Sequence, residues 1–217
     1  MTVVPDTIDI ELGPQRLQAL LGVPPGAIGL VIFAHGSGSG RLSPRNNRVA
    51  AALRDAGLAT LLLDLLTPDE ERDRTNVFDI PLLAGRLSHA TDWSIAAPET
   101  AHLPIGYFGA STGAAAALLA AGVPRSPVKA IVSRGGRPDL AGDALPHVTA
   151  PTLLIVGGLD HQVIELNQHA YRRLAAPKEL VVVDGAGHLF EEPGTLAEVE
   201  RHAALWFRDH LGGEGGG

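Results

Sequence analysis

The sequence predicts an α/β fold, in which a mostly parallel sheet of about eight strands carries helices on both faces. Two observations support this prediction. Apolar runs of strand length, rich in Val, Leu and Ile, recur along the chain, and segments with the apolar spacing of helices separate them. Strands that are apolar throughout are typical of parallel sheets, because helices cover both faces. The chain shows no fixed-period repeat and no long linker, so we expect a single domain over residues 1–211.

The first two strands are expected to form an antiparallel hairpin, because the short runs Thr7–Leu12 and Gln15–Leu21 flank the turn Gly13-Pro14. Six further strands follow, separated mainly by helices. The expected strands are Ile28–Ala34, Leu58–Leu63, Leu103–Gly109, Val128–Ser133, Thr152–Val156 and Glu179–Val183. The expected helices are Arg45–Ala56, Phe78–Ala96, Thr112–Ala121, Val163–Leu174 and Thr195–His210. Two segments are expected to stay irregular, the polar stretch Thr67–Asn76 as a solvated loop and the glycine-rich residues 212–217 as a flexible tail.

Composition excludes several classes of function. The chain has 17 Lys and Arg residues against 24 Asp and Glu, a formal charge of −7, which argues against nucleic-acid and anionic-membrane binding. Without cysteine there is no disulfide, thiol nucleophile or cysteine-ligated metal, and the histidines show no metal-ligand spacing. The start of the chain lacks a basic, apolar signal peptide, and no apolar run approaches the ~18 residues of a membrane span. We therefore expect a cytoplasmic protein without a metal or organic cofactor.

The motif Gly109-Ala110-Ser111-Thr112-Gly113 has the form G-x-S-x-G and lies directly between a predicted strand and a predicted helix. A serine at such a turn is held on a strained backbone and exposed for attack, and the helix N-terminus beside it favours an anionic intermediate. A structural alternative is that Ser111 merely caps the helix.

A second glycine-rich turn, His35-Gly36-Ser37-Gly38-Ser39-Gly40, follows the first buried strand. The backbone N–H groups of Ser37 and Thr112 could together form an oxyanion hole. The turn matches neither a Walker A motif nor a dinucleotide fingerprint, so a phosphate-binding loop is the weaker interpretation. We expect His35 itself to support the loop rather than to act as a base.

Two further residues follow glycines at the ends of successive strands. Asp160 ends the segment Gly157-Gly158-Leu159-Asp160, and His188 ends Gly185-Ala186-Gly187-His188. Ligands of open α/β sheets bind at this edge, where the carboxyl ends of the strands meet. Asp139 also follows a strand and is the rival candidate for the acid.

The order Ser111, Asp160, His188 resembles the α/β-hydrolase superfamily, in particular its small, lidless dienelactone-hydrolase-like and short-chain esterase branch. The resemblance extends from about Ile28 to His210. It implies an α/β-hydrolase fold and a serine ester hydrolase in which Ser111 attacks, His188 is the base and Asp160 orients it. Dienelactone hydrolases proper use a cysteine nucleophile, so dienelactone is a doubtful substrate for this chain. The short interval 133–151 leaves room for a small cap at most, which favours small or short-acyl esters.

Several alternatives remain open at this stage. The same triad could act on a thioester, a lactone or an amide, or the fold could bind a ligand without catalysis; a nucleotide-binding Rossmann protein is a weaker rival. Arginines near the predicted site could recognise a substrate carboxylate, or could simply pair with acidic residues. They are Arg41, Arg45 and Arg48 after the first buried strand, and Arg134 and Arg137 after the Val128–Ser133 strand. The expected partner is a small-molecule ester, and the sequence does not determine the oligomeric state.

Overall fold

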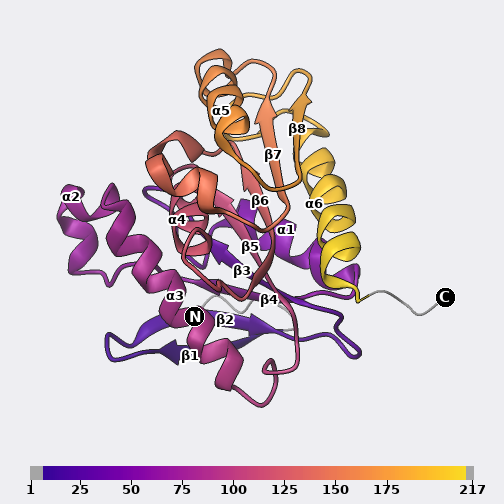
Figure 1. Ribbon diagram of the computed structural model, residues 1–217. Coiled ribbons are helices and arrows are strands. Elements are labelled where there is room, and N and C mark those ends of the chain that lie inside the picture. The colour runs from indigo at the N-terminus through magenta and orange to yellow at the C-terminus, as the bar shows by residue number, and fades with distance from the viewer. Residues whose placement is uncertain (1–6, 214–217) are drawn as a thin grey trace.

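The computed structural model describes residues 7–213, which form one eight-stranded sheet in the order β1-β2-β4-β3-β5-β6-β7-β8 (Figure 1). β2 is antiparallel to both of its neighbours, and all other neighbouring strands pair in parallel. This arrangement confirms the predicted fold class and the N-terminal hairpin. The strands are β1 Ile8–Leu12, β2 Leu17–Gly22, β3 Leu30–Ala34, β4 Ala59–Leu63, β5 Ile105–Ala110, β6 Val128–Arg134, β7 Thr152–Gly157 and β8 Lys178–Val183.

Helices cover both faces of the sheet, with a cluster of buried apolar side chains beneath each layer. α1 (Pro44–Asp55) and α6 (Thr195–Leu211) pack on one face. The other face carries α3 (Ile80–Ala96), α4 (Thr112–Ala121), α5 (His161–Arg173) and the 3₁₀ segment η2 (Pro138–His147). Among residues 7–213, no helix is both long enough and apolar enough to cross a membrane.

Three segments differ from the sequence prediction. The stretch Thr67–Asn76 is not a plain loop, because it contains the short helices η1 (Glu70–Arg72) and α2 (Arg74–Val77). A local hydrogen bond, which periodicity does not reveal, starts α2: the Asp73 carboxylate accepts from the Thr75 N–H at 2.9 Å. Helix α3 begins at Ile80 rather than Phe78, since the Asp79 side chain caps it.

The segment η2 was not predicted. It packs against α4 and α5, and its backbone is kinked at Gly142, which has a positive φ of 53°. It lies within the interval 133–151, where the sequence predicted a small cap at most. Of the predicted C-terminal tail, residues 214–217 lie outside the described residues.

The chain order of the strands creates the site. After β3 the chain passes through α1 to β4 on one side of β3, and then through α3 to β5 on the other side. The helices that follow β3 and β5, α1 and α4, consequently lie on opposite faces of the sheet. A crevice opens at the carboxyl ends of neighbouring strands whose connections diverge in this way, and ligands bind there. The loop after β3 and the turn at Ser111 border this crevice.

Substitutions in helix α6 test how much the apolar layer on its face of the sheet contributes to stability. Phe207 is fully buried in that layer with Phe33 and Phe108, whereas Leu205 on the same helix is exposed. We predict that Phe207→Ala lowers the free energy of unfolding by about 3–5 kcal/mol, because it removes buried contacts and leaves a cavity. Leu205→Ala is the matched control and should change it by less than about 0.5 kcal/mol. Urea denaturation followed by circular dichroism measures both, and equal effects would contradict the assignment of Phe207 to the core.

Candidate active site

Ser111 occupies the turn between β5 and α4 with φ of 50° and ψ of −122°, a conformation that residues other than glycine seldom adopt. Backbone hydrogen bonds hold this turn. The Ser111 carbonyl accepts from the N–H groups of Ala114 at 3.1 Å and Arg137 at 3.0 Å, and the Ser111 N–H donates to the Arg134 carbonyl at 3.4 Å. The Ser111 side chain makes no capping hydrogen bond to α4, so its hydroxyl does not serve the alternative capping role. Strain of this kind persists only where the surroundings enforce it, and it concentrates at functional sites.

The turn at Ser111 lies directly against the end of β3. A Cβ atom at Gly113 would be 2.1 Å from the carbonyl oxygen of Ala34, so only glycine allows α4 to start at this point. A Cβ at Gly36 would likewise be 2.8 Å from the Cβ of Ser111, which shows how closely the loop after β3 approaches the serine. The predicted oxyanion residues sit here: Ser37 follows Gly36, and Thr112 is the first residue of α4, where helix N–H groups lack an intrahelical partner.

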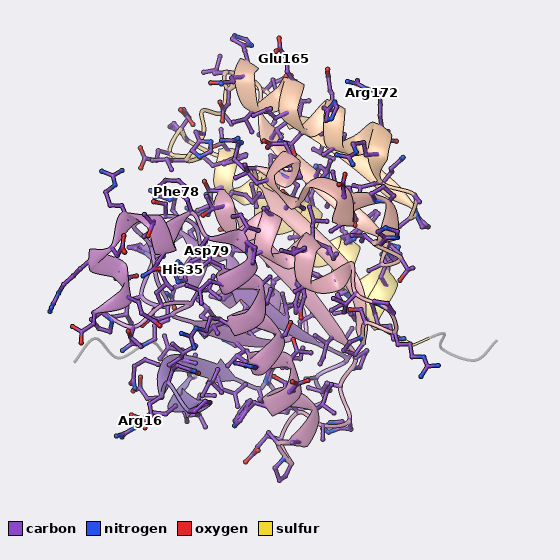
Figure 2. All side chains as sticks on the ribbon, turned by 60° about the vertical axis from the view of Figure 1, so that its left-hand side comes forward. Arg16, His35, Phe78, Asp79, Glu165 and Arg172 are labelled. Atoms are coloured by element: carbon purple, nitrogen blue, oxygen red, sulfur yellow. The ribbon has the colours of Figure 1, made fainter. Side chains whose placement is uncertain are left out.

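His35 supports this loop through both ring nitrogens. Its Nε2 accepts from the Leu65 N–H at 2.9 Å, and its Nδ1 lies 3.0 Å from the Gly36 carbonyl oxygen. The side chain is therefore fixed between the ends of β3 and β4, as expected for a structural residue. His35 lines a cavity together with Val77 of α2 and Leu83 of α3, and Figure 2 labels it in the same part of the view as Phe78 and Asp79.

Asp160 and His188 meet across the ends of β7 and β8. The Asp160 Oδ2 lies 2.6 Å from the His188 Nδ1, although the two residues are 28 positions apart. The loops that carry them are tied together, since the Gly158 N–H donates to the Val183 carbonyl at 2.8 Å and the Leu159 N–H to the Ala186 carbonyl at 2.9 Å. A carboxylate only accepts hydrogen bonds, so Nδ1 of a neutral His188 is the donor and its Nε2 keeps a free lone pair.

One cavity contains Ser111, and a second cavity borders the next residue, Thr112. The first has a volume of about 180 Å³ and is lined by Ser111 and His188 together with Gly36, Ser37, Arg45 and Arg134, among others. The second, of about 110 Å³, is lined by His35, Ser37, Thr112 and the apolar side chains of Leu66, Val77 and Leu83, with Glu71 also present. The sequence did not predict this second cavity, because its apolar wall comes from α2, α3 and the segment after β4, which only packing brings together.

The rival acid and most of the candidate arginines are already engaged. Asp139 forms two hydrogen bonds to the guanidinium of Arg137, at 2.9 and 2.8 Å. This pairing raises the pKa of Arg137. Arg41 forms an ion pair with Asp64, Arg45 with Glu191 at 2.8 Å, and Arg48 with Glu200 at 2.6 Å.

Arg134 differs from these arginines because it is buried and hydrogen bonds to an amide instead of a carboxylate. Its Nη2 donates to the Oδ1 of Asn46 at 3.0 Å. Asn46, on α1, was not singled out in the sequence, since an asparagine in the first turn of a helix has no pattern that marks it as a partner for a residue 88 positions away. Of the candidate arginines, Arg45 and Arg134 line the cavity that contains Ser111 and His188.

No protein-family model matches the chain. Among solved structures, it is similar to a dienelactone hydrolase from Anabaena variabilis, with 56% sequence identity, a TM-score of 0.90, and coverage of 94% of this chain and 97% of that one. The chain belongs to the dienelactone hydrolase family. An α/β serine hydrolase homologue from Coxiella burnetii shares the fold of this family member at a TM-score of 0.76 and 19% identity, covering 94% of this chain and 98% of the other. The name of the Anabaena variabilis protein supports hydrolase activity in general terms, and the Coxiella burnetii likeness concerns the fold alone.

Two curated proteins from Mycobacterium tuberculosis are also similar to this dienelactone hydrolase family member. Each is 59% identical over 210 residues, which are 97% of this chain, and each carries the provisional name of phosphoribosyl transferase. The chain spans about half the length of these relatives, 47%. Their name therefore describes proteins of which only one half is similar to this chain.

The close approach of α4 to β3 leads to a stability prediction. Gly113→Ala should lower the free energy of unfolding by about 1–3 kcal/mol or more, since the new methyl group would overlap the Ala34 carbonyl. The control is Gly85→Ala in the middle of α3, where a new Cβ atom would meet no other atom within 4 Å. This substitution should raise the free energy of unfolding by about 0.4–1 kcal/mol. Urea denaturation distinguishes the two. A Gly113→Ala protein as stable as the parent would contradict the described packing of the turn.

Proposed function

We propose that the protein is a serine hydrolase of small or short-acyl carboxylic esters, with Ser111 as nucleophile, His188 as general base and Asp160 as the acid that orients it. The observation that supports this most is the 2.6 Å contact between Asp160 and the Nδ1 of His188, on a cavity that also contains Ser111 at its strained turn. Each residue of the three has the chemistry of its role, and the contact directs the Nε2 lone pair away from the carboxylate.

The reaction starts with attack of the Ser111 Oγ on the ester carbonyl. A serine hydroxyl is a weak nucleophile at neutral pH, so His188 Nε2 takes its proton as the new bond forms. Asp160 stabilises the resulting imidazolium without taking the proton itself. The imidazolium then protonates the departing alkoxide, which leaves as the alcohol and yields the acyl-serine. Water, deprotonated by His188, attacks the acyl-serine and releases the carboxylic acid, and the proton returns to Ser111.

The tetrahedral intermediate carries a negatively charged oxygen. In this mechanism the backbone N–H groups of Ser37 and Thr112 donate hydrogen bonds to that oxygen and stabilise it. Both residues line the second cavity, next to the serine. The N-terminus of α4 adds its positive dipole at the same point. Removing one such donor typically costs about 2.7–4 kcal/mol of the activation barrier, so this pair would account for a large part of catalysis.

A serine nucleophile distinguishes this chain from dienelactone hydrolases with a cysteine nucleophile, so ester hydrolysis is proposed rather than dienelactone hydrolysis. Thioesters, lactones and amides are chemically accessible to the same three residues. A ligand-binding role without catalysis would not require an aspartate held on His188 at 2.6 Å. The transferase name of the Mycobacterium tuberculosis relatives belongs to proteins about twice as long, of which this chain spans 47%.

Active-site labelling tests the nucleophile. A fluorophosphonate should add once to the protein, as measured by intact mass, and should not add to Ser111→Ala.

With a short aryl ester, Asp160→Asn should lower kcat by about 10⁴-fold, because the imidazole loses the partner that fixes its tautomer. Asp139→Asn is the matched control, since Asp139 also follows a strand but is engaged by Arg137, and it should stay within a few-fold of the parent.

Absence of an adduct on folded wild-type protein would contradict the serine hydrolase proposal and favour a binding role. An adduct on both proteins would place the reactive nucleophile elsewhere.

The size of the second cavity supports a short acyl group. An engineered apolar cavity of about 150 Å³ accommodates one benzene molecule. The cavity beside Ser37 and Thr112 measures about 110 Å³, so it suits an acyl chain of only a few carbons.

Acyl-chain length gives a further test. Across 4-nitrophenyl acetate, butyrate, hexanoate and octanoate, kcat/KM should be highest for the shorter esters and fall beyond butyrate. Val77→Ala should move the optimum to a longer acyl chain, because it shortens a side chain that lines the cavity. Val77 is only partly buried, so we expect the variant to fold. Val123→Ala, at an exposed position after α4, should leave the profile unchanged. A profile that Val77→Ala does not alter would assign the acyl group to a different cavity.

A further inference from the structure

Arg134 is a buried cation on the cavity that contains Ser111 and His188. It is 6% exposed, its Nη2 donates to Asn46 Oδ1 at 3.0 Å, and its Cζ lies 6.0 Å from the centre of the Phe190 ring. Its Nε is buried and has no hydrogen-bond partner. Within residues 7–213, no carboxylate forms an ion pair with this guanidinium.

An unpaired buried charge is costly, and proteins normally pair it or neutralise it. Burial, and then the nearby charge of Arg45, lower the pKa of Arg134 to about 10, so the guanidinium still carries its charge at neutral pH. Among the other candidates, Arg41 and Arg137 each have an aspartate partner, and Arg48 pairs with Glu200. Arg45, which lines the same cavity, is paired only with Glu191, whose side chain is 64% exposed. The cavity therefore has a positive charge, that of Arg134, which no carboxylate of residues 7–213 pairs with directly.

The chemistry of the reaction determines which part of an ester faces this charge. His188 must protonate the leaving oxygen, so the alcohol part of the substrate lies on the side of His188. The cavity on that side contains Arg134 and Arg45. Ser37 lines both cavities, whereas Thr112 lines only the second, whose apolar wall comes from Leu66, Val77 and Leu83. The two cavities thus differ in polarity.

We propose that the substrate is an ester of a short, neutral acid with an alcohol that carries an anionic group, and that Arg134, assisted by Arg45, binds that anion. A carboxylate and a phosphate both suit a guanidinium, which donates two parallel hydrogen bonds to either group. The inference rests on the proposed ester hydrolysis, because the reaction fixes which side the alcohol occupies. Arg134 is a specificity-determining residue in this proposal.

Four matched esters test the side and the charge. The carboxylate 4-acetoxybenzoate and the phosphate 4-acetoxyphenyl phosphate carry the anion on the alcohol side, 4-acetoxybenzamide is neutral, and the 4-carbamoylphenyl monoester of succinate carries the anion on the acyl side. Each kcat/KM is divided by the alkaline hydrolysis rate of the same ester to remove differences in leaving-group reactivity. We expect one or both alcohol-side anions to exceed the neutral ester by roughly 10- to 100-fold, the effect of a charge-assisted hydrogen bond. Whichever is preferred identifies the anion.

Three variants test the residue. Arg134→Gln should abolish the preference for the anionic alcohol, Arg134→Lys should retain part of it, and Arg45→Gln should reduce it. Arg48→Gln is the control for a general change in charge, since Arg48 lies one turn further along α1 and pairs with Glu200. It should keep the preference of the parent. If Arg134→Gln fails to fold, Arg45→Gln, at a more exposed position, still provides the test.

Binding to Ser111→Ala separates this inference from the proposed catalysis. Isothermal titration calorimetry should show that 4-hydroxybenzoate or phenyl phosphate binds at least tenfold more tightly than 4-hydroxybenzamide, and that adding Arg134→Gln removes the difference. This result without any ester turnover by the wild type would overturn the esterase proposal and support the anion site. Turnover of the neutral and alcohol-side anionic esters at equal normalised rates, or a preference for the acyl-side anion, would overturn the anion inference and leave the esterase proposal standing.

Discussion

The contact between the start of α4 and the end of β3 is the constraint on which the rest of the site depends. Gly113 lies so close to the Ala34 carbonyl that no side chain fits between them. This contact brings the turn at Ser111 against the glycine-rich loop after β3, with Gly36 beside the serine Cβ. The strained φ of Ser111, the amide at the start of α4 and the loop that carries Ser37 are all positioned by it. A fold that relaxed this one contact would separate the serine from its neighbours.

The second half of the site depends on hydrogen bonds between two loops at the sheet edge. The loops after β7 and β8 are joined through their backbones, and this pairing sets Asp160 against His188. The fold offers a second carboxylate in the segment η2 that follows β6, in Asp139, but Arg137 engages it with two hydrogen bonds. Two aspartates that follow neighbouring strands thus differ in their hydrogen-bond partners, although their side chains have the same chemistry.

The crevice between these two halves is asymmetric. Towards α2 and α3 its wall is mainly apolar, and towards α1 and the loop after β8 it contains arginines. Most arginines near the crevice form ion pairs with carboxylates, so the crevice as a whole does not attract anions. Arg134 is different, since an amide holds it and burial limits how far water can compensate its charge. A protein with an overall formal charge of −7 thereby presents a localised positive charge next to the serine.

The sequence by itself determined the fold class, the strand and helix order, and the strand–turn–helix that contains Ser111. These features are local: apolar period, glycine at a turn and residue type after a strand each act over a few neighbouring residues. Tertiary structure decided which carboxylate meets His188, which arginines are paired, and where α2 and η2 form. It also decided that Asn46 holds Arg134 and that one cavity is apolar. Those outcomes depend on contacts between residues tens of positions apart, whose geometry is set by how helices pack on the sheet and not by any local pattern.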